Sequence, residues 1–489
     1  MGGGAVEFPG WLTGWLAGDD YTITREILER GVAALYLIAF VQAANQFPAL
    51  LGDHGLLPAR RFLRHPYARK QPTLFRWRYS DRLLRAVAWT GVALSALVVL
   101  GVVQLAPSYI FVPVFLIVWF LYLSIVNIGQ TFYGFGWESL LCEAGFVVAF
   151  LGAWDTAPPI TIVFFVRWLV FRLEFGAGMI KMRGDRSWRD LTALYYHHET
   201  QPMPNPFSRT AHLLPKWWHR VEVLGNHFAQ LIVPWFLFFP QPVASVAAAV
   251  MILTQFWLVL TGNFAWLNWI TIVLAFSAVS DGVWSWLLGG VPVGGIGASD
   301  VPLWYAVVSL AATVFLVVLS WPPLRNLFAR RQLMNASFNR WHLVNAYGAF
   351  GSVTKERYEV VVEGTADDPY DRDAQWREYG FKGKPGDPHR VPRQFAPYHL
   401  RLDWLMWFLA LGARDSPWFK VFLLRLLEAD APTLRLLRHD PFDGEPPRAV
   451  RARMFLYRFS THAEKRQTGD VWVRSEVGDL VPPVSLRGQ

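Results

Sequence analysis

The sequence predicts a polytopic α-helical membrane bundle of about nine spans, followed by a C-terminal extramembrane α+β domain. Hydrophobic residues make up 53% of the 489 residues and charged residues only 17%, whereas an ordinary soluble chain carries about 25% charge. Runs of roughly twenty apolar residues recur up to Trp321, and a helix needs this length to cross a ~30 Å hydrocarbon core. The pattern changes at Pro322-Pro323. We therefore expect the membrane domain over 1–321 and the extramembrane domain over 322–489.

The nine predicted spans divide the first domain into membrane helices and connecting segments. The first span is short and contains three amides, Gln42, Asn45 and Gln46. Two connections, 48–85 and 181–220, are long enough to form extramembrane loops. The spans are expected near 31–47, 86–106, 110–128, 137–153, 160–180, 221–239, 243–261, 265–280 and 302–321.

The tail, residues 322–489, has the pattern of a small α+β domain. Alternating runs near 358–363, 453–459 and 471–477 predict half-buried strands. Two further segments, 398–411 and 417–428, predict helices. The apolar part of the first is eight residues long, which is too short to span, so we expect a core or interfacial helix.

The positive charge is concentrated in the two loops and the tail. The segments 48–85, 181–220 and 322–489 hold 42 of the 46 Lys and Arg residues and a net charge of +17, so the rest of the chain is net negative. An odd number of spans places all three segments on one face. The positive-inside rule assigns that face to the cytoplasm. Topology and anionic lipid headgroups account for this charge, so it does not indicate a nucleic-acid partner.

The sequence excludes an intrachain disulfide and lacks the common nucleotide-binding and serine-hydrolase motifs. Cys142 is the only cysteine and cannot form a disulfide within the chain. The sequence contains no Walker loop, no dinucleotide-binding glycine pattern and no Gly-x-Ser-x-Gly elbow.

Ionisable and amide side chains within the predicted spans are candidate functional residues, because such groups are costly in lipid and usually face protein or water. Arg172 and Glu174 lie two residues apart, so they face different sides of a helix and need other partners. Glu138 and Glu143 are available on another span. Two interpretations stay open: a buried ion-pair lattice that holds the bundle together, and a polar cavity that opens to the basic face. The candidates are Arg172, Glu174, Glu222, Asn226, His227, Asn263 and Asn268.

Lys181 lies at the end of the fifth predicted span, after the small residues Gly176, Ala177 and Gly178. At the membrane boundary, partial desolvation would favour the neutral amine and prepare it to act as a general base. The alternative is that the side chain extends to the lipid headgroups.

The 181–220 loop contains His197, His198 and Glu199, which invite a metal-binding interpretation, with His212, His219 and His227 further along the chain. Adjacent histidines diverge on a helix, and no His-Glu-x-x-His pattern occurs. We therefore predict no metal site. Prolines at 202, 204 and 206 predict an extended, helix-free segment.

Several stretches together resemble the lipase maturation factor family of polytopic membrane proteins. They cover most of the chain beyond about residue 120. The matching stretches are 172–189, 198–206, 222–227, 262–269, 345–357 and 398–407.

The resemblance implies a non-enzymatic factor without a cofactor that assists the folding and assembly of secreted lipases. The expected partners are a secreted lipase or another exported hydrolase, together with membrane lipid. Family members contact clients through the loop that corresponds to 181–220 and through the tail. The candidate client-binding or motif residues are Trp188, Arg189, Asp190, His198, Glu199, Thr200, Gln201, Pro202, Asn205, Asn345, Tyr347 and Lys355.

The resemblance also bears on localisation. Relatives reside in the endoplasmic reticulum membrane, with the tail on the lumenal side, whereas the charge distribution assigns the tail to the cytoplasm. The side is therefore left open. The Ala-, Arg- and Val-rich composition and the lack of a reticulum retrieval signal are typical of a bacterial chain, so we expect an integral, multi-pass protein of a bacterial inner membrane.

A second likeness is confined to 177–181 and Trp188, and it resembles the segment of vitamin K-dependent carboxylases that carries a catalytic lysine. Lys181 occupies the place of that lysine. The likeness implies an alternative function, a membrane enzyme in which Lys181 deprotonates a reduced quinone or a lipid-linked substrate.

Overall fold

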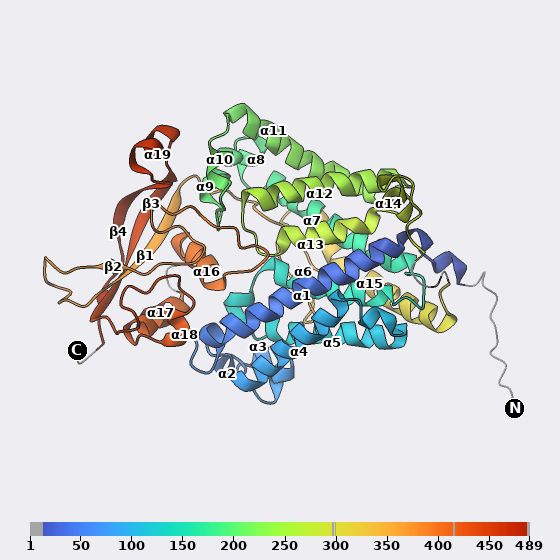
Figure 1. Cartoon of the computed structure of the whole chain (residues 1–489), viewed down its shortest axis with the longest axis horizontal. Coiled ribbons are helices and arrows are strands. Elements are labelled where there is room, and N and C mark those ends of the chain that lie inside the picture. Colours follow the sequence, from blue (N-terminus) through green and yellow to red (C-terminus); the bar gives the residue numbers. More distant parts are fainter. Residues whose placement is uncertain (1–12, 296–297, 299, 414–415, 487–489) are drawn as a thin grey trace.

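The computed structural model describes residues 13–295, 298, 300–413 and 416–486. The molecule is elongated, with a helical bundle at one end of its long axis and a small sheet at the other (Figure 1). The helix α1 (Thr22–Leu51) runs through the bundle and is buried over much of its length. The tail covers the end of the bundle at which α1 finishes.

Within the described residues, six helices are long and apolar enough to cross a membrane. The helices α13 (Leu267–Ala275) and α14 (Asp281–Leu287) form a bent pair with an angle of 101°, which makes a seventh span if the pair is counted as one. The six are α1, α4 (Asp81–Val99), α5 (Ser108–Val126), α11 (Lys216–His227) with its extension to Phe238, α12 (Val243–Thr261) and α15 (Leu303–Phe328).

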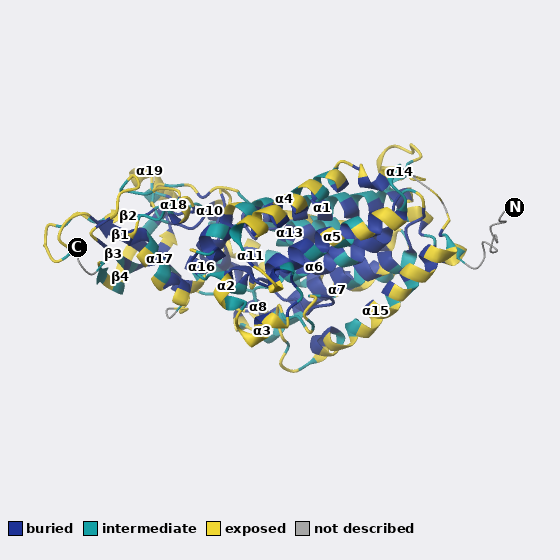
Figure 2. Cartoon of the chain, turned by 90° about the horizontal axis from the view of Figure 1, so that it is seen from below, coloured by how far each residue is buried: buried dark blue, intermediate teal, exposed yellow. Residues whose placement is uncertain are grey.

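The predicted count of nine spans is not confirmed, although each predicted segment does form a helix. The helix α6 (Gly136–Val148) has 13 residues, and this length covers only about 20 Å. The helix α7 (Ile160–Arg183) has 24 residues, but its apolar run is interrupted by Arg167, Arg172 and Glu174. Both helices are largely buried inside the bundle (Figure 2).

Large apolar side chains on the outer helices point away from the protein. Leu253 on α12 is 68% exposed and Val318 on α15 is 66% exposed. Contiguous exposed apolar surface is rare on soluble proteins, and hydrocarbon is its natural surrounding. The bundle is therefore that of an integral, multi-pass membrane protein.

The tail contains a four-stranded antiparallel sheet with the strand order β2-β1-β3-β4. The positions of the three predicted strands and both predicted helices are confirmed, but β1 is buried on both faces and not half-buried as predicted. The two-residue strand β2 was not predicted. The elements are β1 (Arg357–Thr365), β2 (Arg377–Glu378), α16 (Arg401–Ala410), α17 (Pro417–Leu427), α18 (Ala431–Leu434), β3 (Ala449–Phe459), α19 (His462–Thr468) and β4 (Trp472–Val484).

Short helices fill the two basic loops, and both loops contact the tail. Trp188 Nε1 donates to the Phe350 carbonyl at 2.7 Å, and the Arg340 guanidinium donates to the Lys70 carbonyl at 3.2 Å. The two loops and the tail therefore lie at the same end of the bundle, as their charge predicts. The short helices are α2 (Ala59–Phe62), α3 (Pro66–Arg69), α8 (Arg186–Arg189), α9 (Leu194–Thr200) and α10 (Ser208–His212).

Candidate functional site

Two buried carboxylates on α6 bind side chains of the tail, and the first of them is Glu143. Arg172 forms an ion pair with it. Asn345 donates its backbone N–H to Glu143 at 2.9 Å and its side-chain amide at 3.0 Å, and the Tyr347 hydroxyl donates at 2.6 Å. Arg172 also donates to the Asn345 carbonyl at 2.7 Å. Every partner of this carboxylate is thus held in turn by the others.

The second carboxylate, Glu138, binds the start of α16. Arg401 approaches it at 2.8 Å and also donates to the Phe132 carbonyl at 2.6 Å and to Gln42 Oε1 at 3.0 Å. Both side chains of the pair are fully buried. The ion-pair lattice inferred from the sequence is therefore present, and it joins the bundle to the tail. We refer to Glu138, Glu143, Arg172, Asn345, Tyr347 and Arg401 as the tail lock.

Arg357, at the start of the strand β1, binds backbone carbonyl groups in the proline-containing part of the 181–220 loop, and we call this contact the Arg357 clasp. The guanidinium of Arg357 donates to the carbonyl groups of Glu199 and Pro202 at 2.9 and 3.1 Å, and it also binds the Gln201 carbonyl. Asn263 donates to the Pro204 carbonyl at 3.1 Å. Arg357 and Asn263 therefore hold this segment in place through hydrogen bonds to its backbone carbonyl groups.

Amide side chains of the same segment donate hydrogen bonds to the last carbonyl groups of α12. Gln201 Nε2 donates to the Thr261 carbonyl at 2.9 Å, and Asn205 Nδ2 donates to the Leu260 carbonyl at 2.9 Å. The last carbonyl groups of a helix have no partner within the helix. Gln201 and Asn205 are thus C-terminal caps of α12.

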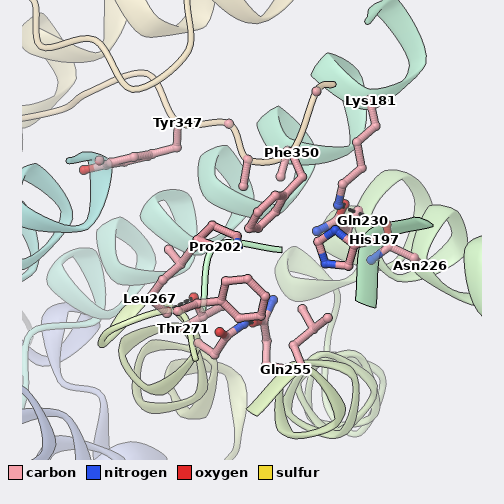
Figure 3. Close-up of a pocket in the computed structure, with 18 of the residues that line it drawn as sticks. Lys181, His197, Pro202, Asn226, Gln230, Gln255, Leu267, Thr271, Tyr347 and Phe350 are labelled. Carbon is pink, nitrogen blue, oxygen red and sulfur yellow. Dashed lines mark hydrogen bonds between the residues drawn. The ribbon is translucent and has the colours of Figure 1, made fainter. Parts of the chain in front are cut away.

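A cavity of about 690 Å³ lies between α7, α11, α12, α13 and the tail. Its wall is mostly apolar, with a few polar side chains that converge on one side, as in many small-molecule sites. Figure 3 shows Lys181 reaching toward Asn226 and Gln230, with Phe350 and Tyr347 contributed by the tail. The cavity is therefore closed partly by the bundle and partly by the tail.

Lys181 is 4% exposed and points into the bundle, so it does not extend to the headgroups. Its ammonium donates to Gln230 Oε1 at 2.7 Å and to Asn226 Oδ1 at 3.1 Å, and it lies 4.9 Å from the centre of the Trp188 ring. Gln230 lies in a π-helical turn, Phe228–Ile232, that extends α11. Such turns often occur at functional sites, because the extra residue re-aims a side chain.

Glu174 continues this polar network along the cavity wall. It accepts from Gln230 at 3.1 Å and from Gln255 at 2.5 Å, and Asn268 donates to Gln255 at 2.6 Å. The network joins α7, α11, α12 and α13. The second interpretation from the sequence is met only in part: the cavity is present and one polar network lines it, but most of its wall is apolar.

The adjacent histidines His197 and His198 diverge, as predicted. His197 packs against Phe350, with ring centres 5.0 Å apart, and burial lowers its pKa to about 3. His198 turns the other way, and its Nε2 lies 3.7 Å from Glu222 Oε1. Glu222 also accepts from Trp257 Nε1 at 2.6 Å, and His227 Nε2 lies 3.0 Å from the Trp188 carbonyl oxygen.

The candidate client-binding residues fall into two sets. Most of them are buried or half-buried and perform the structural roles described above. Three are exposed, Arg189, Asp190 and Lys355. The segments that carry them are in contact, since Asp185 accepts from the Val353 N–H at 3.3 Å. We call the exposed set the junction surface; it comprises Arg186, Arg189, Asp190, Ser352, Lys355 and Glu356.

Sequence reasoning missed Gln230, Gln255 and Trp257. Gln255 lies in the middle of an apolar span, and an amide in that position is a recognised signal of an intramembrane polar site. Nothing local distinguishes Trp257 from the chain's other tryptophans.

The lipase maturation factor transmembrane domain matches residues 23–286, and the lipase maturation factor C-terminal domain matches residues 343–482. No solved structure matches the chain.

Individual relatives cover nearly the whole chain. Human lipase maturation factor 1 is 40% identical over 95% of this chain and 88% of its own length. Mouse lipase maturation factor 1 is 38% identical over 95% and 88%, and human lipase maturation factor 2 is 30% identical over 95% and 83%. Membrane bundle and tail are both included in these matches, and the chain therefore belongs to the lipase maturation factor family.

Proposed function

We propose that this protein is a membrane-embedded maturation factor that assists the folding and assembly of a secreted lipase. The observation that carries the proposal is the 40% identity to human lipase maturation factor 1 over 95% of the chain. The tail lock supports it, because a tail held rigidly on the bundle presents a fixed surface to a folding client.

We further propose the junction surface as the client contact. It is formed by two segments that the family resemblance singled out, and its polar side chains are free of the tail lock and of the Arg357 clasp. Docking on a pre-ordered surface costs little conformational entropy. The buried residues of the 198–205 segment then act indirectly, by holding the 181–220 loop in place.

Co-expression with a secreted lipase tests the maturation role. The lipase is produced in a host that lacks this family, with the chain or with an empty vector, and its activity is measured per milligram of secreted lipase. The proposal predicts a higher specific activity when the chain is present. Equal specific activity in both cultures would refute it.

Charge reversal tests the junction surface. Arg189→Glu and Lys355→Glu should reduce crosslinking of the lipase to the chain and lower lipase specific activity, while the chain itself remains folded. Arg372→Glu, at an exposed position of the tail outside this surface, is the matched control and should retain both. Equal losses in all three variants would show that the contact lies elsewhere.

We propose a bacterial inner membrane as the location, on the basis of composition. Reporter fusions after residues 200 and 489 determine the side of the loop and the tail. A periplasmic result at both positions supports direct contact with an exported lipase, and a cytoplasmic result at both would contradict it.

One observation favours a second candidate function, in which Lys181 is a general base for a reduced quinone or a lipid-linked substrate. Lys181 is buried and lines the cavity, where a neutral amine could accept a hydroxyl proton. Lys181→Ala and Lys181→Arg separate the two functions. A base role predicts loss of maturation activity in both variants with the fold intact, whereas normal activity in both would exclude it.

A further inference from the structure

Three potential metal ligands from two helices converge beside the cavity. His198 lies on α9, and His219 and Glu222 lie on α11 with the i, i+3 spacing that places two side chains on one helix face. One ligand atom of each residue lies within 4.8 Å of the other two. The nearest pairs are His198 Nε2 with Glu222 Oε1 at 3.7 Å and His219 Nδ1 with Glu222 Oε2 at 4.0 Å.

Several polar atoms of this group have no hydrogen-bond partner among the described residues. Both ring nitrogens of His198 are in this position, as are His219 Nδ1 and Glu222 Oε2. His198 is 1% exposed and His219 is 2% exposed. Buried polar atoms are nearly always paired, because leaving them unpaired costs free energy. One ligand atom from each of the three residues lies within 4.8 Å of the other two, and this grouping together with the unpaired atoms favours a ligand between them.

Hydrogen bonds of His219 and Glu222 with neighbouring groups leave lone pairs on their other atoms free to bind a ligand. His219 Nε2 lies 3.3 Å from the His212 carbonyl oxygen. A carbonyl can only accept, so Nε2 carries the proton and Nδ1 is left with a lone pair. Trp257 Nε1 donates to Glu222 Oε1 at 2.6 Å. Such contacts, a backbone carbonyl on a histidine N–H and a donor on the carboxylate, typically surround metal ligands.

We propose that His198, His219 and Glu222 bind a divalent transition-metal ion of the zinc class. Two imidazole nitrogens and one carboxylate suit zinc, whereas calcium and magnesium prefer oxygen ligands alone. His198 and Glu222 also line the cavity. A water molecule or substrate in the cavity would supply the fourth ligand, as in sites where three protein residues leave one position open. The proposal does not depend on the identity of the client.

The competing interpretation is a water-bridged or protonated His198–Glu222 pair without metal. Binding measurements on the full-length protein, purified in detergent and without a histidine tag, distinguish the two. The chain is stripped with a chelator, titrated with zinc, and also loaded with cobalt to record the visible absorption of a tetrahedral site. We expect one zinc ion per chain and a cobalt spectrum typical of nitrogen and oxygen ligands.

Single substitutions test which residues bind the metal ion. His198→Ala and Glu222→Gln should each weaken zinc binding by about 100-fold or more, since even outer-contact substitutions cost 10–100-fold, and Trp257→Phe should weaken it by about 10-fold. His54→Ala, at an exposed position, should bind as the wild type does. Wild-type affinity in His198→Ala or Glu222→Gln would overturn the proposal, as would less than one tightly bound ion per chain in folded wild-type protein. If His198→Ala does not fold, the Glu222→Gln and Trp257→Phe titrations decide.

Discussion

Two polar groups of residues differ in how the hydrogen-bonding capacity of a central residue is satisfied: the tail lock, and His198, His219 and Glu222 on α9 and α11, which we call the histidine group. Both bring together residues from different helices. Glu143 in the lock has an arginine, an amide, a backbone N–H and a hydroxyl as partners. His198 has no hydrogen-bond partner among the described residues. A satisfied network rigidifies a fold, whereas an unsatisfied one is costly unless a ligand completes it. The contrast is between Glu143 and His198, because other atoms of the tail lock, Glu138 Oε1, Arg172 Nε, Asn345 Oδ1 and Arg401 Nε, also have no such partner among the described residues.

The largest effect is expected from breaking the lock at Arg401. Arg401→Ala leaves Glu138 buried without its charge partner, and this typically costs about 3–5 kcal/mol of unfolding free energy. Arg425→Ala removes a partly exposed pair with Glu428 and should cost no more than about 1 kcal/mol. Denaturation in mixed micelles measures both. Similar losses in the two variants would show that the lock does not stabilise the protein.

A smaller effect is expected at Tyr347. Tyr347→Phe keeps the ring and removes the 2.6 Å hydrogen bond to Glu143, and hydrogen bonds to charged groups contribute about 1.5–3 kcal/mol. Tyr370→Phe, at an exposed position, is the control and should be neutral. An unchanged unfolding free energy in Tyr347→Phe would mean that Glu143 is satisfied without the tyrosine.

The pH dependence of stability should report His399, which lies beside Glu138 at the lock. Burial lowers its pKa to about 4, whereas an unfolded histidine titrates near 6.5. Between these values the unfolded chain binds the extra proton, so stability falls as the pH drops from about 6.5 to about 4.

The expected slope from this one histidine is about 1.4 kcal/mol per pH unit. His399→Gln should flatten the slope by that amount, and His462→Gln, at an exposed position, should leave it unchanged. Parallel pH profiles for the wild type and His399→Gln would contradict the assignment.

The smallest effect on stability is expected at His198. In chelator-treated protein, His198→Leu replaces two unpaired buried nitrogens with an apolar group, so the unfolding free energy should stay within about 1 kcal/mol of the wild type or rise. With zinc present, only the wild type should gain stability. A loss as large as that of Tyr347→Phe would place His198 among the structural groups.

The sequence predicted the positions of the helices well and the number of spans poorly. The length and composition of an apolar run do not distinguish a helix that faces lipid from one that is buried in the bundle. The helix α6 is the clearest example, since its 13 residues are surrounded by other helices. The positions of the tail strands were predictable from their alternating pattern, although β1 is buried on both faces and not half-buried.

The site was predictable only in part. The need of Arg172 for a partner followed from the cost of a buried charge, and Glu143 was one of the candidates. The contributions of Asn345 and Arg401 were not predictable, because they depend on how the tail packs on the bundle. His198, His219 and Glu222 were each noted in the sequence, but no metal site was predicted from them, because their spacing along the chain does not show that α9 and α11 bring them together.

The central claim is that a buried ion pair between α6 and α16 locks the tail on the bundle. A double-mutant cycle tests it directly, with unfolding free energies measured for Glu138→Gln, Arg401→Met and the double variant. The lock predicts that the double variant loses less than the sum of the single losses, by about 2 kcal/mol, because each single change leaves its partner buried and unpaired. Losses that add to within about 0.5 kcal/mol would show that the two residues act independently and would contradict the account.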